Sequence, residues 1–174
     1  MPSSDLITEA YRDEQKRLHA TGKYGTASLG FGKVVTEILN KTQCSTMLDY
    51  GCGSMQNLKK VLEPVHNVVY LGYDPAVPEF SEKVPCELVT CIDVLEHIEP
   101  ELLDNVLDDL QAHCQEWGFF TVHTGPAVKT LSDGRNAHLI QEPPAWWLPK
   151  FLARWDLQTF SATRQGFNVL LRAK

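Results

Sequence analysis

The stretch MLDYGCGSMQNL, residues 47–58, constrains the fold more than any other part of the chain. A short, mostly apolar run, 46–50, is followed at once by Gly51 and Gly53, with one residue between them. The run has the length of a buried strand, and glycines directly after it let the backbone turn sharply. They also let a ligand come close to bare backbone. Because short glycine turns occur in many loops, the meaning of this one depends on its neighbours.

Predicted strands and helices alternate along the chain, which is typical of a parallel sheet with crossover connections. Further strands are expected at 67–73, 87–94 and 118–123. Helices are expected at 31–40, 55–62, 101–114 and 143–153, with one or two helical turns within 3–19 and irregular segments at 19–32 and 124–142. The runs 156–163 and 167–172 flank Arg164-Gln165-Gly166, which predicts a hairpin. The fold class is therefore α/β: an open twisted, mostly parallel sheet with helices on both faces and a C-terminal antiparallel hairpin.

Composition narrows the class of protein. The 174 residues suit one domain, and the net charge of −6 argues against a general binder of nucleic-acid phosphates, so we expect no nucleic-acid partner. No apolar run is long enough to span a membrane, and the N-terminus lacks the apolar core of a signal peptide. The five cysteines form no CxxC pair, which favours reduced, buried thiols. These features predict a cytoplasmic protein with no membrane partner.

An acidic residue completes the pattern begun by the glycines. Asp74 closes the second predicted strand about twenty residues after Gly53, where a carboxylate can accept hydrogen bonds from both hydroxyls of a ribose. The dinucleotide fingerprint GxGxxG fails because Gln56 stands at its third glycine position. A glycine turn without a full phosphate motif, followed by a ribose-binding acid, suits a nucleoside without phosphate. S-adenosylmethionine is such a ligand, and its positive charges tolerate acidic surroundings.

Three motifs in register strengthen this interpretation. LDYGCGSMQNL, YLGYDPA and ELVTCIDVLEHI resemble the successive motifs of class I S-adenosylmethionine-dependent methyltransferases, closely over residues 46–123. The resemblance implies a Rossmann-like fold and S-adenosylmethionine as cofactor. It implies that Asp49, Gly51 and Gly53, with Cys52 in the same turn, lie at the methionine part of the cofactor. It further implies that Asp74 binds the ribose and that the adenine and sulfonium lie beside Pro75, Ala76, Ile92, Asp93, Val94 and Leu95.

The sequence departs from this family at two points. Met55 replaces a small residue of the glycine loop, and only about a dozen residues separate Asp74 from the next predicted strand. That is too few for a helix and a strand, so we expect one family strand to be shortened or lost.

Methyl transfer is an in-line displacement, in which the protein aligns the acceptor and a general base takes its proton. His97 and His123 follow predicted strands, and His138 lies in the irregular segment, so all three are candidate bases. Tyr24 and Ser28, in the glycine-rich loop, are candidates to close over the cofactor. Each histidine has the alternative of a purely structural role.

A metal site is an alternative that the sequence leaves open. Asp93, Glu96 and His97, with the later His138, resemble the metal-binding residues of small-RNA 3′-end methyltransferases, although Asp93 stands where that family has Glu. Because similar runs occur in metal-independent class I enzymes, we predict no metal.

The resulting hypothesis is a single methyltransferase domain, 1–174, acting on an oxygen or nitrogen of a small-molecule acceptor as a monomer or homodimer. Residues 1–32 would supply an N-terminal helix and lid loop. Residues 124–150, with Trp146 and Trp147 as an aromatic wall or as core residues, would recognise the acceptor. The alternatives are a metal-dependent RNA 2′-O-methyltransferase and a non-catalytic cofactor-binding partner protein.

Overall fold

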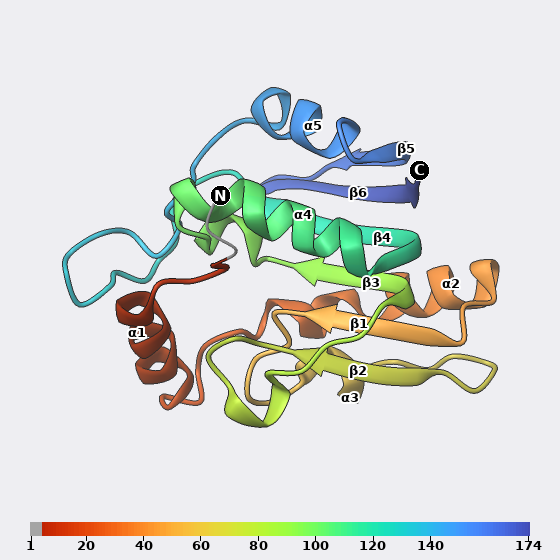
Figure 1. The fold of residues 1–174 in the computed structure, drawn as a ribbon, viewed down its shortest axis with the longest axis horizontal. Helices are drawn as coiled ribbons and strands as arrows, with labels where there is room; N and C mark the ends of the chain where they lie inside the picture. The colour runs from red at the N-terminus through yellow and green to blue at the C-terminus, as the bar shows by residue number, and fades with distance from the viewer. Residues whose placement is uncertain (1–4) are drawn as a thin grey trace.

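The computed structural model describes residues 5–174 and contains one six-stranded sheet (Figure 1). The strand order is β2-β1-β3-β4-β6-β5; β1 to β4 are parallel, and β6 pairs antiparallel with both β4 and β5. The strands are β1 Thr46–Tyr50, β2 Val69–Tyr73, β3 Cys86–Ile92, β4 Cys114–His123, β5 Trp155–Ala162 and β6 Gly166–Ala173. The predicted mostly parallel sheet with a terminal antiparallel hairpin is therefore confirmed.

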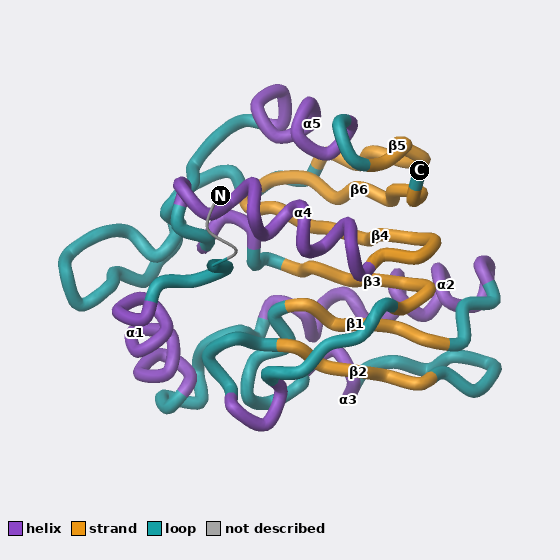
Figure 2. The backbone as a smooth tube through the Cα atoms, in the orientation of Figure 1, coloured by secondary structure: helices purple, strands orange, loops and turns teal. Residues whose placement is uncertain are grey.

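Helices cover both faces of the sheet, as expected (Figure 2). The α-helices are α1 Glu9–His19, α2 Gly32–Thr42, α3 Asn57–Lys60, α4 Leu103–His113 and α5 Pro144–Leu152. The 3₁₀ helices are η1 Ala27–Phe31, η2 Pro78–Phe80, η3 Leu95–His97 and η4 Pro100–Leu102. Because side chains alternate along a strand, Leu48 and Phe120 pack in the core under α4 and α5, whereas Met47 and Phe119 pack in the core under α2.

The connection from β2 to β3 explains why β2 is the edge strand of the sheet formed by residues 5–174. Its residues form only η2 and an irregular path, so β2 stays at the edge of the sheet. Lys83 anchors this path, since its Nζ lies 2.7 Å from Asp109 Oδ2 on α4 and 3.9 Å from the centre of the Tyr73 ring. The prediction that one family strand is shortened or lost is confirmed.

Helix α1 is longer than the one or two turns predicted and lies across the carboxyl ends of the parallel strands (Figure 1). Thr8 caps it by accepting a hydrogen bond from the Tyr11 amide. Tyr11 and Leu18 pack against Leu131 and Ala137 of the irregular segment. Long-range packing, which local sequence does not reveal, therefore stabilises this polar helix.

Other boundaries also differ from the prediction. Helix α3 has four residues, because the left-handed Gln56 delays its start and Val61 ends it. Strand β4 begins at Cys114 rather than at residue 118, since Cys114 already pairs with Cys86 of β3.

All five cysteines are buried and free, as predicted. Among the described residues, none of the helices combines the length and apolar character that crossing a membrane requires.

Asp49 of β1 is a buried acid beneath the glycine turn. Its carboxylate accepts hydrogen bonds from Tyr70 Oη at 2.6 Å and Thr90 Oγ1 at 3.1 Å. Burial nevertheless raises the pKa of Asp49 to about 6. The pKa of Asp49 is higher in the folded protein than in the unfolded chain, so the folded protein holds this proton more tightly. The stability that results is fully present below the unfolded-state pKa and is lost as the pH rises through 6.

We therefore predict that Asp49→Asn gains stability relative to wild type as the pH rises. The asparagine stays neutral, so the difference in free energy of unfolding should shift by on the order of 3 kcal/mol between pH 4 and 7. Urea unfolding at several pH values measures this difference, with Asp156→Asn on the exposed side of β5 as control. Parallel stability curves for wild type and Asp49→Asn would contradict the assignment.

Candidate functional site

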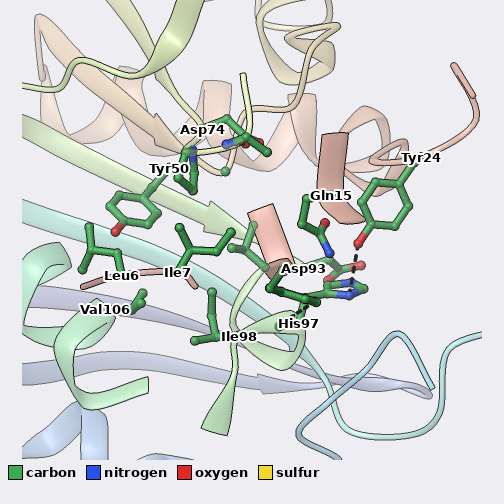
Figure 3. A pocket seen from close by; sticks show the side chains of 15 residues that line it. Leu6, Ile7, Gln15, Tyr24, Tyr50, Asp74, Asp93, His97, Ile98 and Val106 are labelled. Atoms are coloured by element: carbon green, nitrogen blue, oxygen red, sulfur yellow. Dashed lines mark hydrogen bonds between the residues drawn. The ribbon is translucent and has the colours of Figure 1, made fainter. Parts of the chain in front are cut away.

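The carboxyl ends of β1, β2 and β3 open into a small cavity capped by α1 (Figure 3). Its volume is about 90 Å³. The side toward the sheet is lined by Tyr50, Gly51, Asp74, Pro75, Ala76, Asp93, Val94, His97, Ile98 and Val106. The side toward the N-terminal segment is lined by Leu6, Ile7, Tyr11, Gln15 and Tyr24. The sequence motifs after three strands therefore meet at one place, as the parallel sheet predicted.

The glycine turn is held tightly against the end of β2. The amides of Gly51 and Cys52 both donate to the Tyr73 carbonyl, at 2.7 and 3.0 Å. Gly51 has a φ of +82°, and a Cβ atom there would overlap the Val94 side chain. Gly51 is therefore required by the backbone and by packing even before any ligand is considered.

Asp74 lies beside this turn and is almost fully buried. Its carboxylate accepts hydrogen bonds from the Gly53 amide at 3.1 Å and the Ala76 amide at 2.9 Å. His19 of α1 lies above it, with Nε2 3.6 Å from Asp74 Oδ2. The two amides fix the orientation of a carboxylate that still has acceptor capacity toward the cavity.

Asp93 follows β3 and has an unusual backbone. Its φ is +51°, in the left-handed region that non-glycine residues rarely adopt. Thr121 of β4 stabilises it: the Thr121 hydroxyl donates to Asp93 Oδ1 at 2.8 Å, and the Asp93 amide lies 3.0 Å from Thr121 Oγ1. This strained backbone conformation lies beside two cavities, which is where strain of this kind is often found.

A second, larger cavity of about 550 Å³ adjoins the first. It shares Tyr24, Asp93 and His97 with the small cavity, so these three residues stand between them. Its other lining residues are Lys23, Gly25, Thr26, Ala27, His123, Pro126, Ala127, Val128, Lys129, Ala137, His138 and Gln165. All three predicted catalytic histidines therefore line one cavity.

Backbone carbonyls fix the tautomer of two of these histidines, that is, which ring nitrogen carries the proton. His97 Nδ1 lies 2.7 Å from the Ala137 carbonyl, and His138 Nδ1 lies 2.7 Å from the Gly125 carbonyl. Because a carbonyl oxygen only accepts, each Nδ1 carries a proton and each neutral ring keeps a lone pair on Nε2. Burial, together with the neighbouring His138, lowers the pKa of His97 to about 4; burial also lowers the pKa of His138. His97 therefore stays neutral at physiological pH.

Glu96 lies close to His97 and His138 and is fully buried. Its Oε1 accepts a hydrogen bond from the His123 amide at 2.9 Å, whereas its Oε2 is buried and has no partner within residues 5–174. Burial, reinforced by the charge of Asp93, raises the pKa of Glu96 to about 8. Ligand atoms of Glu96, His97 and His138 all lie within 4.8 Å of one another, a grouping that does not include Asp93 or His123.

Several residues expected at the cofactor lie outside the cavity lining. Asp49 is bonded to Tyr70 and Thr90, and Cys52 points its thiol at the Gly53 carbonyl. Ile92 and Leu95 belong to the two cores, and Ser28 lies in η1. Gly53 is also outside the lining, and its nearest side-chain neighbour is His19.

The tryptophans divide between the two roles considered for them. Trp147 is fully buried in the core and donates to the Glu142 carbonyl, whereas Trp146 is partly exposed beneath Lys150. Neither lines a cavity given above. The part of 124–150 that reaches the larger cavity is confined to residues 126–138.

The residues that sequence reasoning missed are on α1. Tyr11 and Gln15 line the small cavity, and His19 covers the glycine turn. A signal was present, because Ile7, Tyr11 and Leu18 share one helical face on which Gln15 also falls. Only the tertiary contacts show that this face turns toward the strand ends.

No protein-family model matches this sequence, and comparison with curated proteins gives no match. Solved structures do match. An O-methyltransferase family protein from Burkholderia thailandensis aligns with a TM-score of 0.63 and 11% identity, over 99% of this chain and 65% of its own, so this chain spans less than two thirds of its length. The 1,6-didemethyltoxoflavin N1-methyltransferase of the same organism, with S-adenosylhomocysteine bound, aligns with a TM-score of 0.59 and 13% identity. The alignment covers 100% of this chain and 92% of that protein. Magnesium protoporphyrin IX methyltransferase from Synechocystis PCC 6803, with S-adenosylmethionine bound, aligns with a TM-score of 0.57 and 13% identity. The alignment covers 98% of this chain and 86% of that protein. The chain therefore has the Rossmann-like fold of S-adenosylmethionine-dependent methyltransferases.

Proposed function

We propose that this protein transfers a methyl group from S-adenosylmethionine to an oxygen or nitrogen of a small-molecule acceptor. The observation that carries the proposal is the pair of adjoining cavities at the strand ends, separated by Tyr24, Asp93 and His97. One is lined by Gly51 and Asp74, and the other is lined by three histidines. In-line transfer needs cofactor and acceptor on opposite sides of the moving methyl group, which two adjoining cavities provide.

In this proposal the ribose of the cofactor binds Asp74, and its methionine part lies over the Gly51–Gly53 turn. The Asp74 carboxylate is already oriented by two backbone amides, so little ordering is left for ligand binding. A cavity of about 90 Å³ is smaller than the ~300–1,000 Å³ of typical ligand pockets. Cofactor entry therefore requires α1, with His19, to move away from the turn.

The acceptor would occupy the larger cavity, whose volume lies within the range of small-molecule sites. There His97 and His138 offer neutral Nε2 atoms that can take a proton from a hydroxyl or an ammonium group. His123 lies 4.7 Å from His138 between ring centres and completes the set of candidate bases. Closure by the N-terminal segment would exclude water from the transfer.

We predict that Asp74→Ala weakens binding of S-adenosylhomocysteine by about 1.5–3 kcal/mol, the scale of hydrogen bonds to a charged group. Asp74→Asn should lose less, since it keeps one acceptor for the backbone amides. Isothermal titration calorimetry measures both, with Asp156→Ala as control. Unchanged affinity in Asp74→Ala, or wild-type preference for NAD or ATP, would contradict the cofactor assignment.

An acceptor screen separates enzyme from binding protein. With labelled S-adenosylmethionine, we expect methyl transfer to at least one small hydroxyl- or amine-bearing compound. Normal cofactor affinity without turnover on any acceptor would favour the alternative of a non-catalytic partner protein.

A second candidate function, metal-dependent methylation of an RNA 2′-hydroxyl, is favoured by Glu96, His97 and His138. Ligand atoms of the three residues lie within 4.8 Å of one another, and one Glu96 oxygen has no partner among residues 5–174. Each histidine also donates its Nδ1–H to a carbonyl, as metal ligands commonly do. These residues therefore fit a divalent cation, which would lower the pKa of a hydroxyl bound to it. The net charge of −6 favours a small acceptor over RNA.

The metal candidate predicts one Mn²⁺ ion bound per chain, with affinity that rises between pH 7 and 8. The pH dependence follows because Glu96, with its pKa of about 8, must lose its proton to bind. Glu96→Gln and His138→Ala should abolish binding, whereas His123→Ala, which is outside the group, should retain it. Calorimetry with MnCl₂ checks this, and absence of binding at both pH values would eliminate the candidate.

A further inference from the structure

Gln15 is an unusual residue for the wall of the small cavity. It lies on the face of α1 that caps the small cavity, and only 9% of its surface is exposed. Its Nε2 atom is buried and makes no well-formed hydrogen bond in the part of the chain that the structure describes, although the Tyr24 hydroxyl lies within its reach. Since the amide carries two N–H groups, at least one has no partner there. A buried donor of this kind costs free energy until a ligand satisfies it.

The position of Gln15 indicates which part of a ligand it faces. Figure 3 shows the small cavity with an apolar end, formed by Leu6, Ile7, Ile98 and Val106, and a polar end, where Gln15 lies beside Tyr24, Asp93 and His97. The faces of an adenine base suit apolar side chains, so the base belongs at the apolar end once α1 has moved to admit the cofactor. The charged amino-acid part of the cofactor then belongs at the polar end.

We propose that the Gln15 amide donates a hydrogen bond to the carboxylate of the amino-acid part of the cofactor. The inference rests on the proposed function and adds a specificity residue to it. A free N–H donor suits the carboxylate, whereas the neighbouring Asp93 carboxylate suits the ammonium group. Gln15 thereby distinguishes the complete cofactor from an adenosine derivative that lacks the amino acid.

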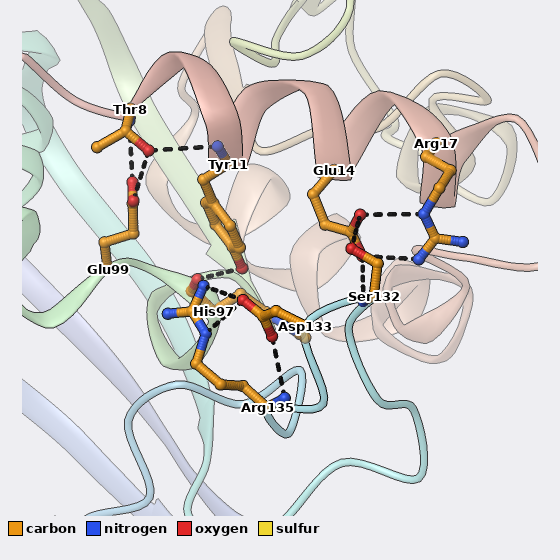
Figure 4. Close-up of polar contacts among 9 residues, drawn as sticks. All are labelled: Thr8, Tyr11, Glu14, Arg17, His97, Glu99, Ser132, Asp133 and Arg135. Atoms are coloured by element: carbon orange, nitrogen blue, oxygen red, sulfur yellow. Dashed lines mark hydrogen bonds and ion pairs between the residues drawn. The ribbon is translucent and has the colours of Figure 1, made fainter.

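The rest of α1 is arranged to hold Gln15 in this position (Figure 4). Tyr11 Oη donates to the His97 carbonyl at 2.6 Å, and the Thr8 hydroxyl donates to Glu99 Oε1 at 2.6 Å. Glu14 accepts hydrogen bonds from the Ser132 amide and hydroxyl, at 2.8 and 2.9 Å. These contacts, all from residues that precede Gln15, tie the helix to the segments that carry His97 and His138.

The test compares two ligands in Gln15→Leu, which keeps side-chain bulk and removes the donor. Calorimetry is run with S-adenosylhomocysteine and with 5′-methylthioadenosine, which has the same adenosyl group but no amino acid. We expect the affinity for S-adenosylhomocysteine to fall about tenfold or more and that for methylthioadenosine to change less than about twofold. Equal loss for both ligands, or no loss for either, would overturn the inference.

Two further variants sharpen the result. Gln15→Glu places a negative charge against the carboxylate, so its loss should be larger than that of Gln15→Leu and again limited to S-adenosylhomocysteine. Asp13→Ala, on the exposed side of α1, should change neither affinity. If wild type binds neither ligand, the proposed function fails; if wild type binds both and Gln15→Leu is indistinguishable from it, only the role of Gln15 fails.

Discussion

The parallel pairing of β1 with β2 and β3 is the constraint on which the whole site depends. Tyr50 lies opposite Tyr73, so the turn at Gly51 and the carboxylate of Asp74 follow from the same level of the sheet. The Tyr73 carbonyl then accepts hydrogen bonds from the amides of Gly51 and Cys52, and the Asp74 carboxylate accepts one from the Gly53 amide. The turn backbone and the Asp74 side chain together thus shape the carboxyl edge of the sheet, where ligands bind in open α/β folds.

The N-terminal segment completes this edge from the other side. Helix α1 contributes Gln15 to the small cavity, and Tyr24 after it lines both cavities. The same helix packs against Ala137, whose carbonyl fixes the protonation of His97. In the proposed function, movement of α1 for cofactor entry would therefore also affect the histidine-lined cavity, and binding of cofactor and acceptor would be coupled.

Much of this arrangement could be predicted from the sequence, because it depends on local patterns. Apolar runs that end at Gly51, Asp74 and Asp93 mark strand ends, and parallel strands bring their ends together. The role of α1 could not be predicted, since its contacts join residues about a hundred positions apart. The inward turn of Asp49 was equally hidden, because burial decides it. The grouping of Glu96 with His97 and His138 was anticipated only through the resemblance to metal-binding methyltransferases, and Asp93, which that resemblance included, lies outside it.

The most direct test is a crystal structure with S-adenosylhomocysteine bound. The account predicts density across the Gly51–Gly53 turn, both ribose hydroxyls within hydrogen-bond distance of Asp74, and the thioether sulfur pointing toward the histidine-lined cavity. A ligand bound elsewhere on the molecule, or a ribose that leaves Asp74 paired only with His19 and the backbone amides, would contradict it.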